Sequence, residues 1–288
     1  MRLREISFEF FPPKNEAQSA TLDSTVERLS RLQPRYVSVT YGAGGTSQER
    51  SLGTVKRMHE RGLATAAHIT CAGASADSIG ETIGWFRALG IARFVALRGD
   101  PPGGLSEPYH PHPSGYRDTA ELVAALKRAG AVEVSVSAYP ERHPQSPDWE
   151  TEIAVLERKV DAGADRAITQ FFFDNDLYDA YRERVRRAGI SIPIVPGIMP
   201  IHRFASVRDF SARCGATIPD TLARRFDGLP PDGDAHADVA AGLASEQIAD
   251  LVARGVDAFH IYTLNRAELT EAVCRTLGVG ESVAACAA

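Results

Sequence analysis

The stretch that decides the fold class is ISFEFFPPK, residues 6–14. It begins as a run of apolar and aromatic residues, which is typical of a buried strand, and it continues into a Phe-Pro-Pro-Lys turn. A doubly wound nucleotide-binding sheet would place a glycine-rich phosphate loop directly after its first strand. Because this turn contains no glycine, the sequence favours another α/β architecture.

Seven further strand-like runs follow at intervals of roughly 30 residues, with about 30 extra residues before the last run. The connectors between the runs carry apolar residues at helical spacing, as at Leu22, Val26, Leu29 and Leu32. Eight strand–helix units close most naturally into a barrel, so we predict an α/β fold with a single-domain (β/α)8 TIM barrel over residues 1–280. The predicted strands are 6–11, 36–41, 65–70, 94–99, 134–139, 167–173, 192–198 and 258–264.

Two segments fall outside the regular repeat. Residues 214–236 are rich in glycine and proline, which predicts an insertion of loops and short helix before the final helix and strand. Residues 281–288 lack apolar periodicity and are predicted to form a disordered C-terminal tail.

The composition limits the classes of function. The chain has 288 residues, 44% of them apolar and 24% charged, which is typical of an ordered globular protein. A net charge of -5 argues against a nucleic-acid partner, so small molecules are expected instead. No signal peptide or membrane-spanning stretch is visible, which predicts a cytoplasmic location without a membrane partner.

The cysteine and histidine spacing predicts no metal site. The four cysteines stand at Cys71, Cys214, Cys274 and Cys286 without a C-x-x-C pair, so free thiols are expected. His110 and His112 have no acidic or cysteine partner at ligand spacing, and they are interpreted as loop residues.

Unusual polar residues fall within or at the ends of the predicted strands. In a barrel the active site forms at the carboxyl ends of the strands, so one convergent site would explain all of them. They are Glu9, Thr40, His68, Thr70, Arg98, Asp100, Tyr139, Gln170 and Tyr262.

Structural explanations stay open for several of these residues at this point. Glu9 could complete a buried hydrogen-bond network, and His68 could be a structural histidine. The segment 98–103 could be a simple turn, because glycine, aspartate and proline favour turns. Arg158 and Lys159 could lie on a solvated helix face rather than bind a phosphate group.

The same segments together resemble bacterial single-domain methylenetetrahydrofolate reductases, and the likeness runs from about residue 6 to residue 278. Nine motifs carry it, which makes it far more specific than one short pattern. They are SFEFFPP (7–13), VSVTYGA (37–43), HITC (68–71), ALRGD (96–100), AYPE with HP (138–141 and 143–144), RKVDAGA (158–164), RAITQFFFD (166–174), PGI (196–198) and FHIYTLNR (259–266).

The resemblance implies a (β/α)8 enzyme with non-covalent FAD. It implies hydride transfer from NADH or NADPH to 5,10-methylenetetrahydrofolate, giving 5-methyltetrahydrofolate for methionine synthesis. Glu9 is implied as the general acid, Asp100 as a carboxylate beside flavin and folate, and Gln170 as a catalytic, substrate-positioning amide. The implied cofactor-binding residues are Thr40, His68, Leu97, Arg98, Gly99, Asp100, Tyr116, Ala138, Tyr139, His143, Glu152, Arg158 and Lys159, and the implied substrate-binding residues are Gln170, Phe210, Tyr262 and Arg266.

The chemistry explains the acid that the resemblance assigns to Glu9. Protonation of folate N10 makes it a leaving group, and hydride can then reach the one-carbon unit. Burial among Phe8, Phe10 and Phe11 is expected to raise the pKa of Glu9 and keep it protonated near neutral pH. Two departures from the family pattern are Glu152, where an aspartate is frequent, and Ser206, where enterobacterial relatives have glutamine.

Two other functions remain open from the sequence. One is another flavin-dependent barrel oxidoreductase, such as a proline-dehydrogenase-like enzyme, and the other is a folate- or flavin-binding module without turnover. The preference between NADH and NADPH is also open, because no Rossmann acidic residue is present to indicate it. A homo-oligomer is expected.

Overall fold

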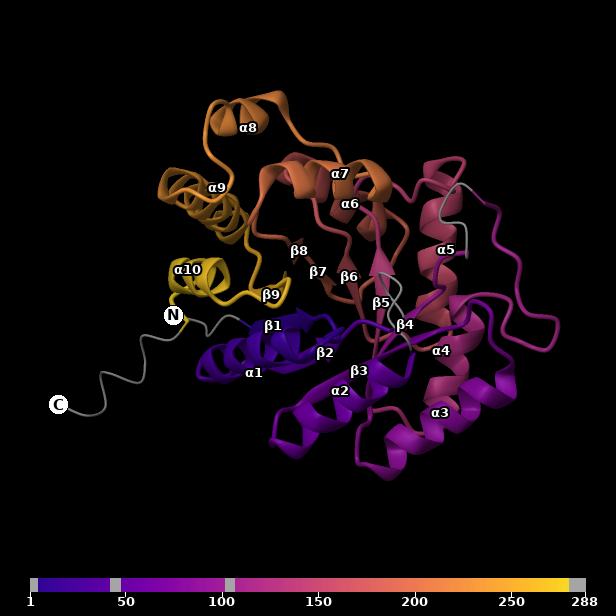
Figure 1. Cartoon of the computed structure of the whole chain (residues 1–288). Coiled ribbons are helices and arrows are strands. Elements are labelled where there is room, and N and C mark those ends of the chain that lie inside the picture. Colours follow the sequence, from indigo (N-terminus) through magenta and orange to yellow (C-terminus); the bar gives the residue numbers. More distant parts are fainter. Residues whose placement is uncertain (1–4, 42–47, 102–106, 280–288) are drawn as a thin grey trace.

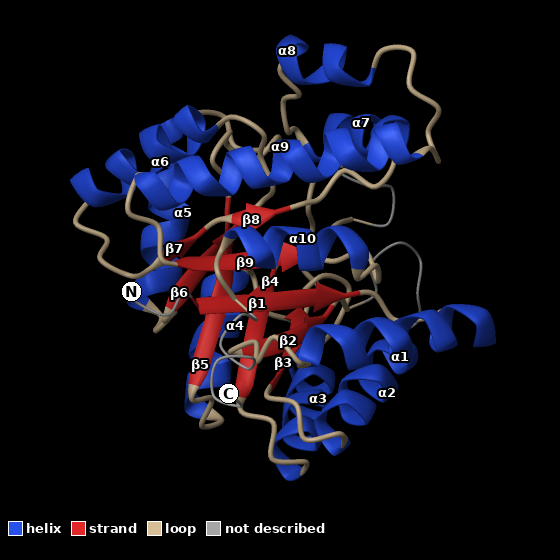
Figure 2. Ribbon diagram, turned by 90° about the vertical axis from the view of Figure 1, so that its left-hand side faces the viewer, coloured by secondary structure: helices blue, strands red, loops and turns tan. Residues whose placement is uncertain are grey.

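The computed structural model describes residues 5–41, 48–101 and 107–279. The predicted tail 281–288 and Cys286 therefore lie outside the described residues. Strands occupy the centre and helices surround them (Figures 1 and 2). The strands are β1 (Glu5–Phe10), β2 (Tyr36–Val39), β3 (Thr65–Thr70), β4 (Arg93–Leu97), β5 (Glu133–Ala138), β6 (Arg166–Thr169), β7 (Ile194–Val195), β8 (Gly197–Ile198) and β9 (Ala258–Tyr262).

The strands pair in parallel in the order β7-β6-β5-β4-β3-β2-β1-β9-β8. The predicted run 192–198 forms both β7 and β8, which flank Pro196. Proline has no backbone N–H to donate, so it interrupts the regular pairing there. Since β7 pairs with β6 and β8 pairs with β9, this one run joins the two ends of the order. The TIM-barrel prediction is confirmed, with its seventh strand in two pieces.

Helices follow the strands along the chain, as the apolar spacing predicts. The connector after β8 is longer than the others and contains three helices and a 3₁₀ turn. The helices are α1 (Glu16–Ser30), α2 (Gln48–Glu60), α3 (Ala76–Ala88), α4 (Thr119–Arg128), α5 (Trp149–Asp161), α6 (Asn175–Arg187), α7 (Phe204–Cys214), α8 (Asp220–Ala223) with the turn η2 (Arg224–Phe226), α9 (Asp234–Ala253) and α10 (Glu268–Thr276).

Strand alternation separates the core into two layers. Successive side chains point to opposite faces of a strand, so one set packs against the helices and the other fills the barrel. Phe8, Phe94 and Val136 belong to the helix-facing core. A small interior cluster contains Tyr36, Ala66, Val95 and Ile168, so the barrel is a packed core.

A separate apolar cluster lies under the long connector. It joins Phe171 after β6 and Met199 after β8 to Val207 of α7, and also to Leu222 and Phe226 of the predicted insertion. In Figures 1 and 2 the α8 segment lies at the periphery beyond α7. The insertion 214–236 thus covers apolar surface beside the barrel.

Candidate active site

The mouth of the barrel, meaning the C-terminal ends of its strands, brings together polar residues that are far apart in the sequence. The strand register places Glu9 of β1 beside Ser38 of β2 and Tyr262 of β9. His68 on β3 faces the same interior and is 4% exposed. The predicted convergence of these side chains therefore follows from the parallel register and the two-residue alternation.

Glu9 is the buried carboxylate of the mouth, with its side chain 12% exposed. Its Oε2 lies 3.4 Å from Nε2 of His260 and 3.6 Å from Nε2 of His68. Burial raises the pKa of Glu9, but the hydrogen bond from His260 and the charges that the two imidazoles can carry lower the pKa by more. The net pKa shift is downward, so Glu9 is a carboxylate at neutral pH.

The expectation of a raised Glu9 pKa in the free protein is therefore wrong. Phe8 and Phe10 point to the opposite face of β1, where both are fully buried in the helix-facing core. The side chains that contact the carboxylate are the imidazoles of His68 and His260. Burial lowers the pKa of His68 to about 4, so this imidazole is neutral at neutral pH.

Backbone contacts after β9 fix the end of the Glu9 strand. Thr263 donates its hydroxyl to the Glu9 carbonyl oxygen at 2.7 Å, and its N–H donates to the same oxygen at 3.1 Å. Asn265 forms two hydrogen bonds with the backbone of Phe11, at 2.9 and 2.8 Å. Asn265 has a φ of 57°, an uncommon value for a non-glycine residue. These contacts hold β1 against β9 next to the site.

Arg158 and Lys159, predicted as a phosphate-binding pair, point in different directions. Lys159 is 6% exposed, and its Nζ donates to the carbonyl oxygen of Ser137 at 2.9 Å. Burial lowers the pKa of Lys159 to about 8. Arg158 is 59% exposed and pairs with Asp118 at 2.9 Å. Only the lysine is directed toward a barrel strand.

Glu152 of α5 forms hydrogen bonds with the loop that follows β5. Its Oε2 accepts hydrogen bonds from the N–H of His143 at 3.1 Å and from the hydroxyl of Ser146 at 2.5 Å. The rings of Tyr139 and His143 meet edge to face at 4.7 Å. Burial, followed by the charges of Arg98 and Lys159, lowers the pKa of His143 to about 4. Tyr139, His143 and Lys159 therefore form one connected part of the mouth.

The segment after β4 carries one cation and one exposed carboxylate. The Arg98 guanidinium lies 4.9 Å from the ring centre of Tyr109, and its Nη2 is buried without a hydrogen-bond partner. Gly99 has a φ of 82°, and a Cβ there would lie 2.9 Å from Cβ of Ala72. Glycine is thus required at this position, because other residues rarely adopt this backbone angle and their Cβ would collide with Ala72. Asp100 is exposed.

An aromatic wall forms on the side of β6 and α7. The rings of Phe171 and Phe210 stack at 5.4 Å, and Tyr262 meets Phe171 edge to face at 6.5 Å. The Tyr262 hydroxyl donates to the carbonyl oxygen of Thr169 at 2.7 Å. The side-chain oxygen of Gln170 accepts from the N–H of Phe171 at 3.0 Å, which fixes the orientation of the amide group.

The remaining predicted residues lie in different surroundings. The Ala138 side chain lies in the helix-facing core, because β5 alternates, and Tyr116 packs against that same core. Leu97 packs on the interior cluster. Ser206 and Arg266 are exposed.

Comparison with known proteins decides the family. A family model described as methylenetetrahydrofolate reductase matches residues 3–278. The chain belongs to the methylenetetrahydrofolate reductase family. The 5,10-methylenetetrahydrofolate reductase of Pectobacterium carotovorum is 42% identical over 282 residues, covering 97% of this chain and 92% of that relative. The enzyme of Escherichia coli K12 is also 42% identical, over 275 residues, covering 95% and 90% of the two chains.

A solved structure supports the fold of this family member. It is described as an uncharacterized protein from Clostridium thermocellum that binds two copies of 5-methyl-5,6,7,8-tetrahydrofolic acid. The TM-score is 0.65 at 13% identity, with 97% of this chain and 95% of that chain covered. Within the described ranges, no helix is both long and apolar enough to cross a bilayer, and no group of three metal-ligating side chains could hold an ion.

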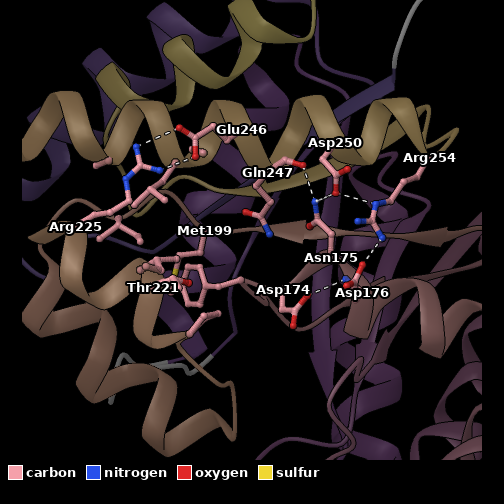
Figure 3. A pocket seen from close by; sticks show the side chains of 17 residues that line it. Asp174, Asn175, Asp176, Met199, Thr221, Arg225, Glu246, Gln247, Asp250 and Arg254 are labelled. Carbon is pink, nitrogen blue, oxygen red and sulfur yellow. Dashed lines mark hydrogen bonds and ion pairs between the residues drawn. The ribbon is translucent and has the colours of Figure 1, made fainter.

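A pocket of about 510 Å³ lies away from the mouth, beside α9, the α8–η2 segment and the start of α6 (Figure 3). None of the predicted site residues is among its described lining residues. Arg225 pairs with Glu246 at 2.6 Å, and Arg254 pairs with Asp250 at 2.7 Å. The pocket thus lies at a junction between the insertion and the barrel helices, where these charges pair with one another.

Sequence reasoning missed four residues of the site. His260 and Ser7 connect to Glu9, Ser137 accepts from Lys159, and Tyr109 lies under Arg98. One signal was available for His260. It stands two residues before Tyr262 in a strand, so both side chains must face the barrel interior.

Proposed function

We propose that this chain reduces 5,10-methylenetetrahydrofolate to 5-methyltetrahydrofolate, with FAD as bound cofactor and NADH or NADPH as reductant. Membership of the reductase family supports the folate reaction. The observation that carries the assignment to specific residues is Glu9, a buried carboxylate that two imidazoles contact at the mouth of the barrel. A cytoplasmic location and a homo-oligomer stay predictions.

The residues at the mouth fit a flavin dinucleotide. Buried polar atoms without a hydrogen-bond partner cost free energy unless a ligand or water binds them, and among the described residues Thr40 Oγ1 and Arg98 Nη2 are such atoms. Arg98 and Lys159 supply positive charge for a pyrophosphate, and Tyr139 with His143 supplies a ring surface. When bound, FAD supplies the two-electron chemistry that passes hydride from the nicotinamide to the folate.

Glu9 would deliver the proton that opens the five-membered ring of the substrate. As the substrate covers the mouth it excludes water, and the loss of solvation raises the pKa of the carboxylate so that it takes up a proton. The O–H bond then breaks as the N10–H bond forms, and the bond between N10 and the one-carbon unit breaks. The positive charge remains on the N5 iminium, and Glu9 returns to the carboxylate.

Three further residues have roles in this proposal. Asp100 places a negative charge near the ring system, which favours the cationic iminium. Gln170, whose side-chain oxygen is held by the N–H of Phe171, orients the folate through its amide nitrogen. Phe210, stacked on Phe171, offers a flat surface that the nicotinamide and the folate occupy in turn.

The test is an anaerobic titration of the purified protein, followed by its visible spectrum. We expect a yellow protein whose released cofactor is FAD, bleached by NADH or NADPH and restored by methylenetetrahydrofolate. Bleaching by L-proline instead would indicate a proline-dehydrogenase-like enzyme. A protein that binds flavin or folate without bleaching would be a binding module, and one that binds no FAD would overturn the proposal.

A further inference from the structure

A buried hydrogen-bond chain leads from Ser7 of β1 through His260 of β9 to Glu9. Nδ1 of His260 lies 2.8 Å from the hydroxyl of Ser7, and Nε2 of His260 lies 3.4 Å from Oε2 of Glu9. His260 is 0% and Ser7 is 1% exposed. The two residues are register partners on β9 and β1, so the strand pairing itself builds the chain.

The contacts assign the proton positions on His260. A carboxylate can only accept, so the hydrogen bond to Glu9 requires the proton on Nε2. In a neutral ring Nδ1 is then an acceptor, to which the Ser7 hydroxyl can donate at 2.8 Å. The carbonyl oxygen of Phe259 is farther from this hydroxyl, at 3.4 Å, and the Tyr36 hydroxyl also lies near it. Ser7 therefore fixes the Nε2–H form of His260.

The two carboxylate oxygens of Glu9 are not equivalent. Oε2 faces both imidazoles, whereas the contacts of the described residues give Oε1 no hydrogen bond. The Nε2–H of His260 can bind Oε2 whether Glu9 is a carboxylate or a carboxylic acid, because a carboxyl group keeps one acceptor oxygen when protonated. A proton that enters from the mouth is then directed to Oε1.

We propose that Ser7 and His260 are positioning residues that hold Oε2 of Glu9 and so place the catalytic proton on Oε1. This inference rests on the proposed role of Glu9 as the acid. His260 keeps its own proton throughout the reaction, and the proton that reaches folate N10 leaves Oε1. Ser7 acts one step farther away, by keeping Nδ1 of His260 unprotonated.

The decisive experiment compares two substitutions of His260 in the FAD-loaded enzyme. A glutamine side chain at this position could donate to Oε2 but could not supply a proton, so His260→Gln separates positioning from proton donation. We expect His260→Phe to slow the folate half-reaction about 100-fold, as for a misplaced acid, and His260→Gln to recover to within about tenfold of wild type. Equal slowing in both variants would overturn the positioning role. The nicotinamide half-reaction should persist in both.

Ser7 supplies a second test, which does not require the protein to fold with His260 replaced. Ser7→Ala should slow the folate half-reaction by about three- to tenfold, the effect of losing one buried hydrogen bond. The matched control is Ser38→Ala, since Ser38 is equally buried on the adjacent strand and its hydroxyl, within the part of the chain that the structure describes, donates to the backbone oxygen of Phe8 at 3.5 Å. Equal rates in the two variants would contradict the proposal.

Nitrogen-15 NMR of histidine-labelled protein adds a readout other than turnover. We expect the neutral Nε2–H form of His260 in the FAD-loaded enzyme at neutral pH, with an Nδ1 resonance that shifts in Ser7→Ala and not in Ser38→Ala. An Nδ1–H form would overturn the inference. If Glu9→Gln reduced folate normally, the proposed function of Glu9 would fail instead, so the two failures are distinguishable.

Discussion

The two ends of the barrel use charged residues in opposite ways. At the N-terminal end, Glu5 pairs with Arg35 and Arg166, and Glu133 pairs with Arg35 and Arg93. Every carboxylate of this network faces a guanidinium group. At the C-terminal end, Glu9 faces two imidazoles, and none of its ion pairs with described residues involves an arginine.

This difference separates stability from function. Charges that neutralise one another inside the protein need no ligand, so the N-terminal network closes the barrel. Single atoms of Arg35, Arg93 and Glu133 also lack a hydrogen bond, but these side chains are ion-paired with one another. Among the ion pairs of the described residues, Arg98 and Lys159 at the other end have no carboxylate partner, although burial penalises unpaired polar groups. Such perturbed, under-partnered groups are typical of functional sites. The comparison predicts that substitutions at the two ends affect different measurements.

The largest expected effect is that of Glu9→Gln on the folate half-reaction. Glutamine keeps the size of the side chain but cannot deliver a proton. Reduction of flavin by nicotinamide should persist, while reoxidation by methylenetetrahydrofolate should slow by about 10²–10⁴ in stopped-flow measurements. FAD content and thermal stability should change little. Equal slowing of both half-reactions would remove Glu9 from the acid's role.

Arg166→Met tests the opposite end. The Arg166 side chain is 7% exposed and pairs with Glu5, so its removal leaves a partly buried carboxylate with Arg35 as its remaining partner. We expect a loss of about 3 kcal/mol in the free energy of unfolding, measured by denaturant titration, with both half-reactions unchanged in the folded enzyme. As a matched control, Arg254→Met removes a more exposed arginine and should cost about 1 kcal/mol or less. A large kinetic defect in Arg166→Met would break the comparison.

The two ends should also lose stability in different pH ranges. Burial lowers the pKa of His68 from 6.5 to about 4. As pH falls from 6.5 to 4, this imidazole is therefore protonated in the unfolded chain but not in the folded protein, and the free energy of unfolding decreases. His68→Gln should remove a pH-dependent loss of about 2–3 kcal/mol over this range. Burial raises the Glu5 pKa, but Arg166 and Arg35 lower it by more, so its stabilisation is present above pH 4.5 and lost below it.

Thermal unfolding between pH 3 and pH 7.5, at fixed flavin content, would measure both slopes. Glu5→Gln should flatten only the part of the curve below pH 4.5, where the salt-bridged carboxylate titrates. A His68→Gln curve parallel to wild type from pH 6.5 to pH 4 would show that this imidazole is protonated in the folded state.

The sequence was sufficient to predict the barrel and the meeting of Glu9 with His68 at its mouth. The roles of the site residues stay predictions. Periodicity predicted the strands, and polar residues at strand ends predicted the mouth, because both signals are local. It was insufficient for contacts that depend on register, such as Ser7 with His260. The pKa of Glu9 was also predicted wrongly. Its neighbours in sequence point to the opposite face of the strand, and the imidazoles that contact it come from β3 and β9.

Arg158 and Lys159 show the same limit, and separating them sharpens the comparison. Lys159→Met should weaken FAD binding by about tenfold, since a buried ammonium group at the mouth can reach a phosphate with little screening. Arg158→Met should weaken it by no more than about threefold, with an effect that salt removes, because this side chain is exposed and already paired with Asp118. Equal losses of FAD affinity in the two variants would indicate that both side chains contact the pyrophosphate.

The smallest expected effect belongs to Asp100, the exposed carboxylate of the mouth. A negative charge near the flavin disfavours the anionic reduced ring, so Asp100→Asn should raise the midpoint potential, by about 10–30 mV for a solvent-screened charge. Folate should then reoxidise the flavin more slowly, while reduction by nicotinamide stays comparatively intact. Asp220→Asn on α8, also exposed, is the matched control and should leave the potential unchanged. Because the effect is Coulombic, it should shrink as ionic strength increases. A potential that falls in Asp100→Asn would contradict the placement of this carboxylate beside the flavin, and the mouth would then lack its proposed negative charge.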